Sequence, residues 1–74
     1  MKNQINTTAN TYDVIFNDSD NSNSKGFEQT AEYCIEYITR YNGTNESYFA
    51  DYKGGTVSVV CNETGEEVYS VGIF

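Results

Sequence analysis

Apolar and polar side chains alternate along residues 11–17, where the chain reads Thr-Tyr-Asp-Val-Ile-Phe-Asn. In an extended chain, Tyr12, Val14 and Phe16 share one face, and Ile15 lies on the other. This period of two predicts a β-strand with one buried face.

The segments on both sides of this strand are polar. Residues 1–10 contain one isolated apolar side chain of any size after the initial Met, Ile5, and we expect them to form a flexible N-terminal arm. Residues 17–24 are all Asn, Asp or Ser, whose side chains compete with backbone hydrogen bonding, and they predict a loop. We therefore expect a single domain over residues 11–74.

The hydrophobic period becomes helical in the middle of the chain. At about 100° per residue, one stripe of the helix holds five side chains: Phe27, Ala31, Cys34, Ile38 and Tyr41. Asn42-Gly43 is a typical C-terminal stop, and the start lies either near Ser24 or at Thr30. We prefer a start at Thr30, which places Phe27 before the helix.

The last third of the chain predicts two antiparallel turns. Gly54-Gly55 suits a two-residue hairpin loop, because glycine accepts positive φ at both central positions. That hairpin would bring apolar partners onto one face in three pairs: Tyr52–Val57, Ala50–Val59 and Tyr48–Cys61. A second turn over residues 62–65 would continue the inner face with the pairs Val59–Tyr69 and Val57–Val71, and would pair Val60 with Val68 on the other face.

These elements predict a small two-layer α+β domain. One helix packs on a mainly antiparallel four-stranded sheet, in the order β-α-β-β-β. The strand over residues 11–17 lies beside either the first or the last strand of the three-stranded meander. A normal crossover makes it parallel to its neighbour in either place.

The same register predicts an apolar patch on the sheet face that one helix leaves open. Its members are Ile15, Phe49, Val60 and Val68. Two interpretations stay open: the N-terminal arm folds over the patch through Ile5, or the patch joins two copies into a structural or regulatory homodimer.

Composition limits the chemistry available to the chain. Its 74 residues include 11 Asp and Glu against 4 Lys and Arg, for a net charge of −7, and no His. Histidine is the usual general base and the commonest metal ligand. Cys34 and Cys61 face the predicted core without a CxxC pattern, so we expect two buried thiols, with a disulfide as the alternative. We predict no catalytic residue, metal, cofactor or enzyme activity.

Part of the negative charge forms a ridge on the predicted helix. Glu28, Glu32 and Glu36 repeat every four residues, and Tyr33 and Tyr37 stand beside them. Such a ridge either keeps a small protein soluble or binds a partner, since Tyr and carboxylate groups together suit an Arg-rich surface. We take these five residues as the candidate partner-binding surface.

The partner that this surface predicts is a protein with a basic surface. The negative charge disfavours direct nucleic-acid binding, and no apolar run is long enough for a signal peptide or a membrane span, so we expect a cytoplasmic protein. In size, acidity and lack of catalytic groups, the chain looks like the small acidic inhibitors of phages and mobile elements, such as anti-CRISPR and anti-restriction proteins. This resemblance rests on no motif. It implies an inhibitor that mimics nucleic acid and blocks the basic site of a nucleic-acid-handling protein.

Overall fold

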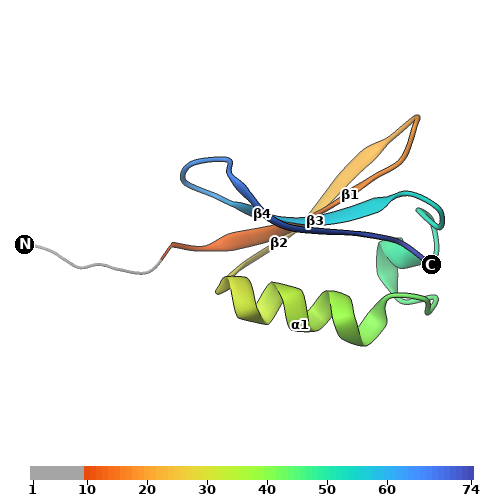
Figure 1. Cartoon of the computed structure of the whole chain (residues 1–74), viewed down its shortest axis with the longest axis horizontal. Helices are drawn as coiled ribbons and strands as arrows, with labels where there is room; N and C mark the ends of the chain where they lie inside the picture. Colours follow the sequence, from red (N-terminus) through yellow and green to blue (C-terminus); the bar gives the residue numbers. More distant parts are fainter. Residues whose placement is uncertain (1–9) are drawn as a thin grey trace, which may run out of the picture.

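The computed structural model describes residues 10–74, which form one helix and one antiparallel sheet (Figure 1). The predicted N-terminal arm lies, except for Asn10, outside the described residues, as does the contact expected from Ile5. The elements follow in the order β1 (Tyr12–Asn17), β2 (Ser22–Gln29), α1 (Ala31–Tyr41), the 3-10 helix η2 (Ser47–Phe49), β3 (Thr56–Cys61) and β4 (Glu67–Gly72).

The predicted fold class is confirmed: α1 packs on a four-stranded sheet in a small two-layer α+β domain. The strands lie in the order β2-β1-β3-β4, and every neighbouring pair is antiparallel. The strand over residues 11–17 therefore lies inside the sheet, and its predicted parallel pairing is wrong. Two strands precede the helix and two follow it, so the expected order β-α-β-β-β becomes β-β-α-β-β.

The second strand comes from the polar tract that predicted a loop. Only its middle turns: the carboxylate of Asp18 accepts hydrogen bonds from the backbone of Asp20 at 2.8 Å and of Asn21 at 2.7 Å. From Ser22 the chain is extended again and pairs with β1. Because β2 is an edge strand with mostly exposed residues, it needs few apolar side chains, and pairing with β1 overrides the weak strand propensity of Ser and Asn.

The predicted strand ending at Gly54-Gly55 is also wrong. Residues 47–49 form η2, and the backbone of Gly54 and Gly55 bonds instead to Ile73, at 2.9 Å in both directions. A Cβ at Gly55 would lie 2.1 Å from the carbonyl oxygen of Asn17. Glycine is therefore required at position 55 for close backbone approach, and the Gly-Gly pair joins the C-terminal segment rather than closing a hairpin.

The turn between β3 and β4 follows its prediction closely. Val57 pairs with Val71 and Val59 with Tyr69, as the sequence predicts. A bulge then shifts the register by one residue, so Val60 pairs with Glu67 instead of Val68. The bulge leaves the pairs Val57–Val71 and Val59–Tyr69 in their predicted register and changes only the pair next to the turn.

The helix begins where the preferred start places it. The hydroxyl of Thr30 accepts a hydrogen bond from the backbone N–H of Tyr33 at 3.1 Å, which caps the first turn. Cys34 and Ile38 are fully buried against the sheet. The core beneath them is formed by Val14, Phe16, Phe49, Tyr52, Val57, Val59 and Ile73.

Much of this core is aromatic. Phe16 packs against three rings, Tyr48 at 5.4 Å, Phe49 at 4.9 Å and Tyr52 at 6.1 Å between ring centroids. These four residues are called the buried aromatic cluster below. Phe49 and Tyr52 come from the segment that predicted a strand, and its compact turns place both side chains under the helix side of the sheet.

Candidate protein-binding surface

The acidic ridge is shorter than the sequence predicts. Glu32 and Glu36 lie exposed on α1, one helical turn apart. Glu28 lies in β2 at a positive φ of 53°, and its backbone N–H donates to the carboxylate of Asp13 at 3.2 Å. This irregular backbone belongs to a bulge between β1 and β2, so Glu28 does not continue the helical ridge.

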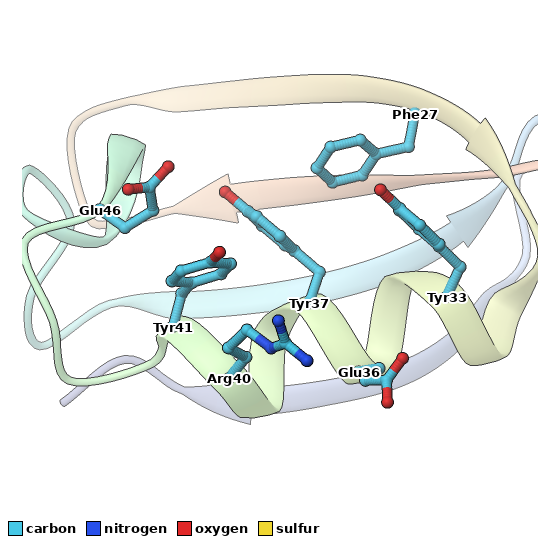
Figure 2. A pocket seen from close by; sticks show the side chains of 7 residues that line it. All are labelled: Phe27, Tyr33, Glu36, Tyr37, Arg40, Tyr41 and Glu46. Carbon is cyan, nitrogen blue, oxygen red and sulfur yellow. The ribbon is translucent and has the colours of Figure 1, made fainter.

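The two tyrosines of the predicted surface belong to a larger group of rings. Tyr33, Tyr37 and Tyr41 follow one flank of α1 at intervals of four residues, and Phe27 from β2 meets them (Figure 2). The ring centroids of Phe27 and Tyr37 lie 4.7 Å apart, those of Phe27 and Tyr33 5.7 Å, and those of Tyr37 and Tyr41 5.1 Å. We call these four residues the open aromatic cluster.

A hollow of about 290 Å³ lies along this cluster, between α1, β2 and the segment that leads into η2. It is lined by Phe27, Tyr33, Glu36, Tyr37, Arg40, Tyr41 and Glu46. Tyr33 is 47% exposed. A second, shallower hollow adjoins the first on the other side of Tyr33 and is lined by Thr30, Glu32, Tyr33, Ile35 and Glu36. Four of the five residues predicted for partner binding therefore line one of these two hollows: Glu32, Tyr33, Glu36 and Tyr37.

One polar atom in this surface lacks a partner. The hydroxyl of Tyr37 is buried and has no hydrogen-bond partner among the described residues. Burial raises the pKa of this hydroxyl, the Ser47 side chain opposes the shift by hydrogen bonding to the ionised form, and the nearby Glu46 carboxylate adds to it. Because the oxygen is buried, a ligand in the hollow meets the ring of Tyr37 and not its hydroxyl.

Phe49, the largest member of the patch predicted on the other sheet face, does not lie there. Phe49 is fully buried in the core, because η2 turns its ring inward. Ile15 and Val60 are half-buried on the outer face, and Val68 beside them is 44% exposed. Among residues 10–74, both helices lie on the opposite face of the sheet, so these three side chains have no helix above them (Figure 1).

The two thiols are free and buried. Burial, together with the charge of Asp13, raises the pKa of Cys34, whose thiol lies 3.5 Å from the backbone oxygen of Tyr12. Hydrogen bonds with the Thr64 side chain and with the backbone of Thr64 and Glu63 lower the pKa of Cys61. Within residues 10–74, no three His, Cys, Asp or Glu side chains are grouped to hold a metal ion.

The structure adds four residues to the surface that the sequence predicts. Tyr41 and Phe27 belong to the predicted core stripe but line the hollow, and Arg40 and Glu46 join them. The repeat of Tyr at positions 33, 37 and 41 is visible in the sequence and marks one helix flank. Glu46 carries no such signal, because the turn into η2 brings it to the hollow.

No helix of the described region, residues 10–74, has the length and apolar character needed to cross a membrane. No family model, curated protein or solved structure matches this chain.

Proposed function

We propose that this protein is a non-enzymatic module that binds the basic surface of another protein. The binding surface consists of Glu32, Tyr33, Glu36 and Tyr37 with the hollow that they flank. One observation supports this proposal above the others: an open aromatic cluster and exposed carboxylates share one concave flank of α1.

These residue types supply binding free energy in a well-understood way. Tyr is enriched among the residues that dominate protein interfaces, because its ring buries a large area with few rotatable bonds. Carboxylates form charge-assisted hydrogen bonds with Arg and Lys. The net charge of −7 also accelerates encounter with a positively charged partner.

The proposed partner is a nucleic-acid-handling protein, and binding inhibits it by occupying its basic site. Glu32 and Glu36 are separated by about 6 Å along the helix axis, a spacing comparable to that of successive phosphates on one strand. Tyr33 lies beside them and offers an aromatic face to the arginines that normally contact nucleic acid. The inhibitor is thus proposed to belong to the phage or mobile-element type.

Affinity capture with charge-matched variants tests this proposal. The immobilised full chain is exposed to bacterial lysate at low and high salt, beside the variants Glu32→Lys/Glu36→Lys and Glu63→Lys/Glu66→Lys. Each double substitution changes the net charge from −7 by four to −3, so the two variants differ only in where the charge is lost. Glu63 and Glu66 lie exposed in the turn before β4, away from the hollow.

The expected result is that nucleic-acid-binding proteins are retained by the parent at low salt and released at high salt. They are lost with the Glu32/Glu36 variant and kept with the Glu63/Glu66 variant. Equal loss with both variants would show that only the total charge matters, and retention of no nucleic-acid-binding protein by the parent would overturn the proposed partner class.

A second candidate function is a homodimer formed through the outer sheet face. The exposure of Val68 at 44%, beside Ile15 and Val60, favours it. Val68→Asp tests this candidate without touching the core. A dimer that the substitution separates, measured by light scattering after gel filtration, would support the homodimer, and a parent that is monomeric at all concentrations would exclude it.

A further inference from the structure

We propose that the hollow between α1 and β2 is a receptor for one arginine side chain of the partner. The inference rests on the proposed function and names the group that this surface recognises. The guanidinium stacks on the rings of the open aromatic cluster and donates hydrogen bonds to the carboxylate of Glu46.

The size of the hollow suits one side chain. Its volume of about 290 Å³ lies just below the range of roughly 300–1,000 Å³ that is typical of pockets for drug-sized ligands. Figure 2 shows Tyr33, Tyr37 and Tyr41 rising from α1 toward β2, with the Phe27 ring coming from β2 to meet them. A flat group can therefore enter along the ring faces, whereas a large cofactor cannot.

The aromatic walls favour a cation. The face of a Tyr or Phe ring carries negative electrostatic potential and attracts a positive charge within about 6 Å of its centroid. The protein already contains one such contact, with Nζ of Lys25 6.0 Å from the ring centroid of Tyr48. In the hollow, Tyr33 and Tyr41 offer similar rings that no cation of residues 10–74 covers in this way.

The polar groups of the hollow select arginine among cations. The carboxylate of Glu46 lines the hollow at the end that the Tyr37 hydroxyl approaches (Figure 2). Arginine presents five N–H donors in the plane of a group that also stacks on aromatic rings, so it can stack and donate to this carboxylate together. A quaternary ammonium has no N–H donor for the carboxylate.

Arg40 is the one lining residue that opposes a cation. Together with Glu36 and Glu46 it leaves the hollow with a formal charge of −1, from two carboxylates and one guanidinium. Arg40 follows Glu36 by one helical turn, the spacing at which the two charges stabilise each other. Removing the Arg40 charge should strengthen the binding of an incoming guanidinium, because the hollow then carries two carboxylates and no cation.

The test titrates the full chain with N-acetyl-arginine methylamide while backbone and aromatic NMR signals are recorded. The matched probe is the citrulline analogue, which has nearly the same shape and no charge, and tetramethylammonium is the probe for a donor-free cation. We expect the arginine probe to shift signals of Phe27, Tyr37 and Glu46 with a Kd of about 1 mM, typical of one isolated side chain. The other two probes should bind at least several-fold more weakly.

Three substitutions sharpen the result. Glu46→Gln should weaken the arginine probe about three- to tenfold, Arg40→Gln should strengthen it, and the remote control Glu63→Gln should leave it unchanged. Equal binding of the citrulline analogue, or no shift at Phe27 and Tyr37, would overturn the inference.

If the arginine probe fails while lysate capture still depends on Glu32 and Glu36, the proposed function stands without this receptor. If capture fails while the probe binds, the hollow recognises arginine but the proposed partner class is wrong.

Discussion

The buried and the open aromatic clusters use the same residue types in opposite ways. Phe16, Tyr48, Phe49 and Tyr52 pack between the sheet and the turns around η2, and Phe16 and Phe49 have no exposed surface. The open cluster adjoins the buried one, and the ring centroids of Tyr37 and Phe49 are 5.7 Å apart where the two clusters meet. Tyr33, by contrast, keeps nearly half of its surface in solvent.

The polar atoms of the two clusters show the same contrast. In the buried cluster, the side chain of Asn23 donates to the hydroxyl of Tyr52 at 2.6 Å, and Lys25 lies over the ring of Tyr48. In the open cluster, the hydroxyl of Tyr37 is buried without a partner. The first cluster thus has polar partners within the domain, and the rings of the second line a hollow that a ligand can enter. Similar aromatic content therefore stabilises the fold in one place and favours binding in the other.

The largest expected difference is in the free energy of unfolding. Phe49→Ala removes a fully buried ring and should cost about 3–5 kcal/mol, because the cavity cannot be refilled by the packed sheet. Tyr33→Ala should cost about 1 kcal/mol, since its ring is already half solvated. Urea unfolding followed by circular dichroism measures both values. Equal costs would show that the open cluster is part of the core.

Removing a single hydroxyl should change stability in opposite directions in the two clusters. Tyr52→Phe leaves the amide of Asn23 without its acceptor and should destabilise the fold by about 1 kcal/mol. Tyr37→Phe removes a buried hydroxyl that has no partner, so its effect should be zero or stabilising. Both variants keep the ring and differ only in hydrogen bonding. A destabilised Tyr37→Phe variant would show that this hydroxyl is satisfied in the free protein.

The contrast between the clusters also explains how much of the fold the sequence predicts. The period of two over 11–17, the helical stripe with its Thr30 cap, and the turn before β4 each depend on local pattern, and the structure confirms them. These elements supply the helix and three of the four strands, and the fourth strand is β2 rather than the one predicted before Gly54. They also place Tyr33 and Tyr37 on an exposed flank of the helix.

The parts that the sequence misses depend on contacts between distant segments. Gly55 must be glycine because the backbone of Asn17 approaches it, and nothing in Gly54-Gly55 distinguishes that need from a hairpin. Residues 22–29 become a strand because β1 offers an edge to pair with. These two contacts move Phe49 into the core and Glu28 away from the helix, which is why part of the predicted surface changes.

A smaller effect is expected at the cation of the buried cluster. Lys25→Met keeps the apolar stem but removes the charge over Tyr48, and should cost about 0.5 kcal/mol, the usual value for a partly exposed cation–π pair. Lys25→Arg serves as the control because it retains the cation. Urea unfolding at matched salt measures both. A Lys25→Met variant as stable as the parent would show that this contact adds nothing, and would weaken the case for cation binding in the open cluster.

The smallest expected effect is a pH dependence of the free energy of unfolding that comes from Tyr37. It is absent at neutral pH. Burial raises the pKa of Tyr37 in the folded protein above its ordinary value of 10.0. At neutral pH the hydroxyl is protonated in both states and contributes no pH dependence. As the pH approaches and passes 10, the unfolded chain loses this proton before the folded chain does, so the stability of the parent falls until the folded-state pKa is passed. Tyr37→Phe lacks this loss. The stability of Tyr37→Phe relative to the parent should therefore increase between pH 9 and pH 11, measured by urea unfolding at each pH. A flat difference between Tyr37→Phe and the parent would place the Tyr37 hydroxyl in solvent and remove the buried hydroxyl that distinguishes the open cluster.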